Sequence, residues 1–192
     1  MADYAAITGW GKCIPPAVLT NDDIATIIDT SDEWIRTRSG IQERRVSHVP
    51  CSDLAAVAAQ RAAAGADIDM QDVDLLIVAT CTPDTVIPST AAHVQRKIGA
   101  SNAAVFDLNA GCSGFIYGLS VATSMIRSGA YKKAIVIGAE RVTYYLNWSV
   151  RDTVVLFGDC AGAVVVEPSE QESGLLFSHL GCEGEALDAL HL

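Results

Sequence analysis

Residues 106–115 read Phe-Asp-Leu-Asn-Ala-Gly-Cys-Ser-Gly-Phe, and this stretch decides how the chain folds. Residues 103–108 predict a short buried strand, and residues 113–128 predict a helix. Cys112 therefore lies at a strand-to-helix turn, among small residues that leave its sulfur accessible. Unpaired N–H groups at a helix N-terminus favour a thiolate over a thiol. This context predicts a nucleophile; the alternative is the packing role that most free cysteines have.

Other apolar runs on either side of this stretch predict further strands of the same sheet. The run Asp74–Thr80 is apolar throughout, as in a strand buried on both faces, and residues 133–138 repeat the pattern. A first strand is expected at Tyr4–Thr8, before a Gly-Lys-Cys-Ile-Pro-Pro turn. Two late strands are expected at Thr153–Phe157 and Gly162–Glu167.

Helix signals alternate with these strands. A helix over residues 22–28 has Thr20 or Asn21 as its cap, and a short helix opens at Ser31 and ends at Gly40. The dipeptide Ser52-Asp53 is expected to cap an alanine-rich helix that ends near Gly65. Another helix starts at Ser89, with Gly99 just past its end. Alternating strands and helices predict a mostly parallel, three-layer α/β sheet in one domain over residues 1–192.

The helix after Cys112 carries no charge before Arg127. A helix on the outside of a sheet normally has a polar stripe, so this one is expected to be buried on all sides. Some element beyond the visible sheet should then cover its second face. The alternative is an unusually buried surface helix.

The composition excludes several classes of protein. The chain has 192 residues and a formal net charge of −10, which disfavours a nucleic-acid partner because phosphate binding needs clustered Lys and Arg. No apolar run is long enough for a membrane span, and the N-terminus lacks the pattern of a signal peptide. The six cysteines form no Cys-x-x-Cys pair and no histidine has metal-ligand spacing, so reduced thiols, no metal site and a cytoplasmic setting are expected.

Four motifs occur in the order that one enzyme family has them. They are residues 29–45 (Asp-Thr-Ser-Asp-Glu-Trp-Ile-Arg-Thr-Arg-Ser-Gly-Ile-Gln-Glu-Arg-Arg), the Cys112 segment, Trp148–Thr153 and Phe157–Gly162. Together they resemble the N-terminal half of 3-oxoacyl-[acyl carrier protein] synthase III. The resemblance implies a thiolase-like fold, in which this chain would be one αβα half of a five-layer αβαβα architecture. That architecture would bury the Cys112 helix between two sheets.

The resemblance also implies roles for single residues. Cys112 matches the residue that accepts the acyl group as a thioester. Trp34 matches the residue that stacks on the adenine of coenzyme A, Arg38 and Arg151 match contacts to its nucleotide end, and Thr30 matches a lesser contact there. Flat aromatic and guanidinium groups suit such stacking. Without the family, Trp34 would be interpreted as a half-buried helix anchor and Arg38 as a solvated charge.

Two more residues match the acyl pocket of the family. Ile87 falls in a loop that lines this pocket near a dimer interface, and Phe157 lies near the acyl tunnel; both could equally be core residues. The family also uses a His and an Asn from its second half. The late histidines of this chain, His179 and His191, lie in no matching motif.

The resemblance therefore implies a decarboxylative Claisen condensation that starts fatty acid synthesis. An acyl-CoA primer and malonyl-acyl carrier protein would be the substrates, with an acyl-Cys112 thioester between them, no cofactor, and a homodimer as the assembly. This chain would supply the nucleophile and would need a second polypeptide for condensation. Two alternatives stay open: a starter condensing enzyme of polyketide or quinolone biosynthesis, and a non-catalytic half-fold subunit that pairs with a partner chain.

Overall fold

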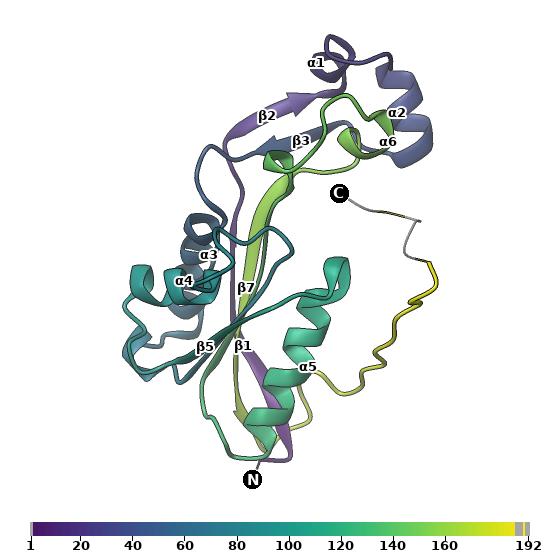
Figure 1. Cartoon of the computed structure of the whole chain (residues 1–192). Helices are drawn as coiled ribbons and strands as arrows, with labels where there is room; N and C mark the ends of the chain where they lie inside the picture. Colours follow the sequence, from purple (N-terminus) through teal and green to yellow (C-terminus); the bar gives the residue numbers. More distant parts are fainter. Residues whose placement is uncertain (1, 187–189, 191–192) are drawn as a thin grey trace.

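A five-stranded mixed sheet forms the centre of the computed structural model, which describes residues 2–186 and 190. The strand order is β1 (Tyr4–Cys13), β7 (Asp159–Ser169), β6 (Ala134–Arg141), β4 (Leu75–Ala79) and β5 (Ala104–Leu108) (Figure 1). β4 pairs in parallel with β5 and β6, whereas β7 is antiparallel to both β6 and β1. The expectation of a mostly parallel sheet is thus corrected to a mixed one. The connection from β6 to β7 stays at one end of the sheet and includes no crossover helix, so the chain must return antiparallel.

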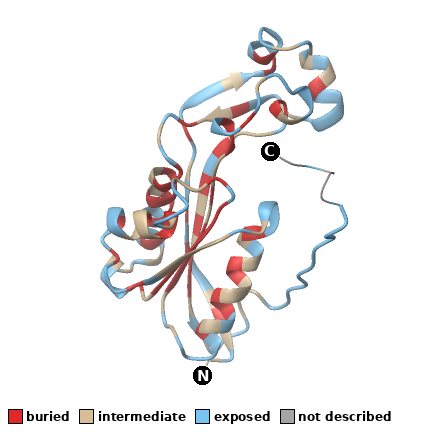
Figure 2. Cartoon of the chain, in the orientation of Figure 1, coloured by how far each residue is buried: buried red, intermediate tan, exposed pale blue. Residues whose placement is uncertain are grey.

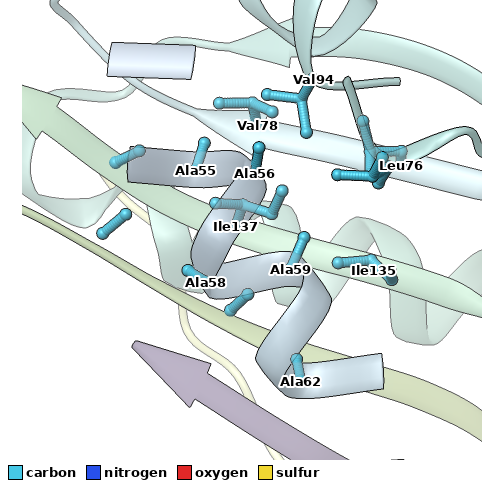
Figure 3. Packing of buried hydrophobic residues seen from close by; sticks show 14 of the residues in the cluster. Ala55, Ala56, Ala58, Ala59, Ala62, Leu76, Val78, Val94, Ile135 and Ile137 are labelled. Atoms are coloured by element: carbon cyan, nitrogen blue, oxygen red, sulfur yellow. The ribbon is translucent and has the colours of Figure 1, made fainter. Parts of the chain in front are cut away.

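Helices cover both faces of this sheet (Figure 1). α3 (Cys51–Ala66) and α4 (Thr90–Ile98) lie on one face, and α5 (Gly114–Arg127) lies on the other. Alanines of α3 pack against the branched side chains of β4 and β6, as Figure 3 shows for Ala55, Ala59 and Ile137. Because alanine is small, the axis of α3 lies close to the sheet, and this face holds the largest buried cluster.

Gly11 of β1 lies against the backbone of α3. A Cβ added at Gly11 would overlap the carbonyl oxygen of Ala58 and the amide nitrogen of Ala62. We expect Gly11→Ala to lower the free energy of unfolding by about 1–3 kcal/mol, measured by urea denaturation. Gly162→Ala is the matched control, since the nearest atom to its added Cβ is 4.0 Å away on the adjacent strand. An equal loss in the two variants would contradict the close contact between α3 and β1.

α5 is covered on one side only within the described part of the chain. Gly118, Leu119 and Ile126 are buried against the sheet, while Ile116 on another side of the helix is 45% exposed. Figure 2 shows this alternation of buried and exposed colours along α5. Within the described residues α5 is therefore half-exposed, and the alternative of an unusually buried surface helix is wrong. Only the irregular segment after β7 approaches its outer side, where the Tyr117 hydroxyl donates to the Gly181 carbonyl oxygen at 2.9 Å. A covering element from beyond the sheet stays a prediction.

A small unit lies at one end of the long strands β1 and β7 (Figure 1). It consists of the antiparallel pair β2 (Ala17–Thr20) and β3 (Glu43–Val46) with the helices α1 (Asn21–Ala25), α2 (Asp32–Ser39) and α6 (Arg151–Val154). Its core is a separate buried cluster that includes Ile24, Ile35 and Val154. The strand predicted at Thr153–Phe157 is wrong, since the run begins inside α6. A short apolar run suits either a buried strand or a buried helical turn, and here Val154 and Val155 pack into this cluster.

Most predicted helix boundaries agree with the structure. Ser31 caps α2 by accepting the Trp34 N–H, and Gly40 ends α2 with φ +75°. Ser89 and Gly99 bound α4 as expected. The predicted cap of α3 is wrong: Pro50 is the N-cap residue. Further bounds differ as well: β1 extends to Cys13, α1 ends at Ala25, and the strand expected at Gly162–Glu167 spans Asp159–Ser169 as β7.

Candidate active site

Cys112 lies in a single 3-10 turn, η2 (Gly111–Ser113), which joins the end of β5 to the start of α5. Gly111 turns the chain with φ +53°, in the left-handed region that glycine adopts without strain. Asn109 supports the turn by accepting the Gly111 N–H at 3.2 Å. The Ser113 and Gly114 amides donate to the Ala110 and Gly111 carbonyl oxygens. The Cys112 N–H has no acceptor among the described residues and is available to an oxyanion. The Cys112 residue itself is exposed, as the sequence predicts for a nucleophile.

The Cys112 thiol opens into a hollow of about 170 Å³. β4, β5 and β6 are parallel, so their carboxyl ends meet at one edge of the sheet, and the hollow lies there. Sequence reasoning missed Glu140 and Cys160 as neighbours of Cys112. A signal was present for Glu140, because it is a charged residue directly after an apolar strand run. The hollow is lined by Ala79, Gly111, Cys112, Phe115, Gly138, Ala139, Glu140 and Cys160.

Glu140 fixes the segment that follows β4. Its carboxylate accepts the Cys81 N–H at 2.8 Å, the Thr82 hydroxyl at 2.5 Å and the Thr80 hydroxyl at 3.4 Å. Hydrogen bonds to a charged acceptor are stronger than those between neutral groups. Glu140 therefore ties the ends of β4 and β6 together beside Cys112.

Cys81 is held in its protonated form by the same surroundings. Cys81 is exposed at the surface, yet desolvation of its thiol by the surrounding protein and the nearby Glu140 carboxylate raise the pKa of Cys81 to about 12. Because the thiolate is the reactive form, a thiol with this pKa is ionised to only about 10⁻⁴ at pH 8. We expect alkylation of Cys81 by iodoacetamide to be slow at pH 8 and to rise about tenfold per pH unit up to pH 10.

Peptide mapping by mass spectrometry measures this rate. Cys182, exposed in the segment after β7, is the internal control within the same chain. Glu140→Gln removes the negative charge and should speed the alkylation of Cys81. If Cys81 and Cys182 react equally fast at pH 8, Cys81 does not have this environment.

Three residues predicted to bind coenzyme A come together in the small unit. Two guanidinium groups lie over the ring of Trp34 in α2. The group of Arg38 is 4.7 Å from the ring centroid, and the group of Arg151 is 4.6 Å from it. Arg151 comes from α6, far along the chain, and its Nη1 also donates to the Asp29 carbonyl oxygen at 3.4 Å. The three flat groups thus form one stack of cation–π contacts.

Thr30 lies between Asp29, whose carbonyl oxygen accepts from Arg151, and Ser31, the N-cap residue of α2. Its hydroxyl oxygen is buried and has no hydrogen-bond partner among the described residues. A buried hydroxyl without a partner is uncommon. A surface hollow of about 490 Å³ lies beside Arg151, between the α1–α2 loop and the start of α6. It is lined by Ile27, Ile28, Asp29 and residues 149–152.

The two predicted acyl-pocket residues do not line the Cys112 hollow. Ile87 is 88% exposed on the loop before α4. Phe157 packs instead against the buried cluster of the small unit. Their assignment to an acyl pocket stays a prediction. His191, another residue singled out from the sequence, lies outside the described residues.

Metal-binding groups and membrane-spanning helices are both absent from the described residues. No group of three or more His, Cys, Asp or Glu side chains there is placed to hold a metal ion. Within the same residues, every helix is too short or too polar to cross a membrane.

Comparison with known proteins identifies the relatives of this chain. Residues 106–184, which include Cys112, match the family model of 3-oxoacyl-[acyl-carrier-protein (ACP)] synthase III. The chain is 58% identical over 187 residues to beta-ketoacyl-[acyl-carrier-protein] synthase III 2 of Vibrio vulnificus (strain YJ016), covering 97% of this chain and 52% of that protein. Over the segment that holds Cys112, the chain is thus similar to the 3-oxoacyl-[acyl-carrier-protein] synthase III family.

Solved structures of related enzymes have the same fold. The crystal structure of beta-ketoacyl-[acyl carrier protein] synthase III from Thermus thermophilus superposes with a TM-score of 0.92 at 40% identity, over 97% of this chain and 58% of that one. The priming beta-ketosynthase of the R1128 polyketide biosynthetic pathway gives a TM-score of 0.86 at 34% identity, over 88% and 52%. The thiolase-like fold of the synthase III family is therefore the fold of this chain, which spans about half the length of the relatives it matches.

Proposed function

We propose that Cys112 accepts an acyl group from a coenzyme A thioester, as the first step of a decarboxylative condensation. One observation carries the proposal: Cys112 is exposed in a hollow, on an uncapped turn at the start of a long helix. The sulfur attacks the thioester carbonyl carbon, and the electron pair of the C=O bond moves to its oxygen. When this intermediate collapses, the bond to the coenzyme A sulfur breaks and an acyl-Cys112 thioester remains. The Cys112 N–H is the donor that would stabilise the oxyanion.

The nucleotide end of the thioester would bind at the Trp34 stack. An adenine ring can replace one guanidinium on the Trp34 face, with Arg151 or Arg38 turning toward the phosphates. The unpaired hydroxyl of Thr30 supplies a nearby polar contact. Coenzyme A would thus be a substrate carrier, and no separate cofactor takes part.

The second step would use malonyl-acyl carrier protein. Loss of carbon dioxide from the malonyl group gives an enolate, whose carbon attacks the carbonyl carbon of the acyl-Cys112 thioester. The bond from that carbon to the Cys112 sulfur then breaks, which regenerates the Cys112 thiolate and releases 3-oxoacyl-carrier protein. This step would start fatty acid synthesis. We place the enzyme in the cytoplasm, because all six cysteines are free thiols.

Condensation would need a second α/β half. The outer side of α5 and the adjoining sheet surface are open: Trp10 is 70% exposed beside an apolar hollow of about 360 Å³ that Phe115, Gly138 and Val164 help to line. An exposed apolar surface of this kind marks a contact with another element. We propose that a second half-fold covers it, on the same polypeptide or as a separate chain, and brings the His and Asn groups of the family. The exposed Ile87 loop would then serve a homodimer contact.

Acyl transfer is tested directly with radiolabelled acetyl-CoA. Peptide mapping should locate the label on the peptide that contains Cys112, and label on another cysteine would overturn the assignment. Addition of malonyl-carrier protein should give a condensed product only when the second half is supplied. Efficient condensation by residues 1–192 alone would contradict the need for that half.

A starter condensing enzyme of another pathway is the second candidate. The similarity to the priming beta-ketosynthase of a polyketide pathway favours it. A panel of acyl-CoA primers, with the products identified by mass spectrometry, separates the two. A non-catalytic half-fold subunit, the third candidate, would keep its biological activity in a Cys112→Ala variant.

A further inference from the structure

Arg44 is a buried cation without an acidic partner among the described residues. It lies on β3 and is 5% exposed. Its Nη1 donates to the Asn21 side-chain oxygen at 2.9 Å and to the Leu19 carbonyl at 3.4 Å, and its Nη2 donates to the Val155 carbonyl at 2.8 Å. Burial lowers the pKa of the Arg44 guanidinium. Burying a charge costs free energy unless its hydrogen bonds are well placed, so these three contacts must be maintained for Arg44 to remain inside.

Asn21 extends this contact to both ends of α2. Its side chain is 1% exposed, and its Nδ2 donates to the Asp32 carboxylate and to the Ile41 carbonyl, each at 2.8 Å. Asp32 is the first residue of α2, and Ile41 follows the Gly40 that ends it. Asn21 therefore fixes the helix that carries Trp34 and Arg38.

The other end of the network reaches the helix of Arg151. Val155, whose carbonyl accepts from Arg44, is the C-cap residue of α6, and Arg151 is the first residue of that helix. One line of buried hydrogen bonds thus joins α2 to α6 through Asn21 and Arg44. Side chains of these two helices meet at the stack, where the Arg151 guanidinium of α6 lies 4.6 Å from the centroid of the Trp34 ring of α2.

We infer that Arg44 and Asn21 are positioning residues for the nucleotide end of coenzyme A. Neither touches the Cys112 hollow, and together they set the distance and angle between Trp34 and Arg151. With α2 and α6 fixed, a ring can enter the stack by the movement of one arginine side chain, without a shift of either helix. The inference rests on the proposed function, because it assumes that coenzyme A binds at this stack.

The test compares two thioesters that differ only in the nucleotide end. Acetyl-CoA carries it, and the acetyl thioester of N-acetylcysteamine does not. Arg44→Met and Asn21→Asp should raise the KM of acyl transfer from acetyl-CoA about tenfold and leave transfer from the truncated thioester within twofold of the wild type. Asn21→Asp is nearly isosteric and keeps an acceptor for Arg44, but it removes the donor to Asp32 and Ile41.

Arg45→Met is the matched control. Arg45 follows Arg44 on β3, but it pairs with Glu43 at the surface, so its loss should change neither KM. Thermal melts show which variants fold. If Arg44→Met does not fold, Asn21→Asp tests the inference in its place. An equal loss with both thioesters, or an equal effect of Arg44→Met and Arg45→Met, would overturn the inference.

Failure of the proposed function gives a different result. The wild-type protein would then transfer acetyl from neither thioester. In that case calorimetric titration with coenzyme A tests the positioning role by itself. Binding to Asn21→Asp that is about tenfold weaker than binding to Arg45→Met supports the role. Equal binding to the two variants, or binding to neither, overturns it.

Discussion

A Cys112→Ala variant is expected to lose acyl transfer from acetyl-CoA by at least about 10³-fold, because it removes the sulfur that we propose forms the acyl-enzyme thioester. Cys112 lies in an exposed turn, so the change leaves no buried cavity and should alter the free energy of unfolding by less than about 0.5 kcal/mol. Single-turnover labelling with radioactive acetyl-CoA measures the loss. Urea denaturation checks that the variant is folded.

Cys160→Ala is the matched control for this variant. Cys160 lines the same hollow, and burial together with the nearby Asp159 raises the pKa of its thiol. The control should therefore keep most of the labelling. If Cys160→Ala and Cys112→Ala lose labelling equally, the hollow is required but Cys112 is not the specific acceptor.

An Asp159→Ala variant is expected to lose about 3 kcal/mol of folding stability, since it would leave three buried donors without their acceptor. Asp159 is 2% exposed at the start of β7. Its carboxylate accepts the Ser47 N–H at 2.7 Å, the Thr143 N–H at 2.9 Å and the Thr143 hydroxyl at 2.6 Å. It therefore ties together the segment after β3, the segment after β6 and the start of β7.

Urea denaturation of the pair Asp159→Ala and Thr143→Val measures this role. Thr143→Val removes only one of the three donors and should cost about 1 kcal/mol. A loss below about 1 kcal/mol for Asp159→Ala would contradict a structural role, given the usual cost of one buried unpaired group.

The local features around Cys112 were predictable because they depend on neighbouring residues. An apolar run, small residues and a second apolar run predict a strand, a turn and a helix, and the structure confirms these three elements. The expected burial of the strand is wrong, because β5 lies at the edge of the sheet and has no buried residue. The caps Ser31 and Ser89 were also predictable, since each side chain bonds an amide three residues along the chain.

Predictions that depended on partners far along the chain failed or were not possible. The run 153–157 has the pattern of a strand, yet its first residues form a helical turn because a buried cluster of the small unit is available to them. The apolar pattern of α5 predicts burial on every side, but it does not identify the element that covers the second side. Asp159 belongs to a motif visible in the sequence, while its three donors come from two distant segments.

Local sequence was enough to predict that Cys112 follows a strand and precedes a helix, and the motifs resembled those of one family. Only the tertiary structure decided that Glu140 and Cys160 share the hollow of Cys112, and that Arg151 stacks on Trp34. The physical reason is the range of the interactions. Strand, turn and cap signals act within a few residues, whereas the meeting of two side chains from distant segments depends on sheet order and helix packing, which the whole chain sets together.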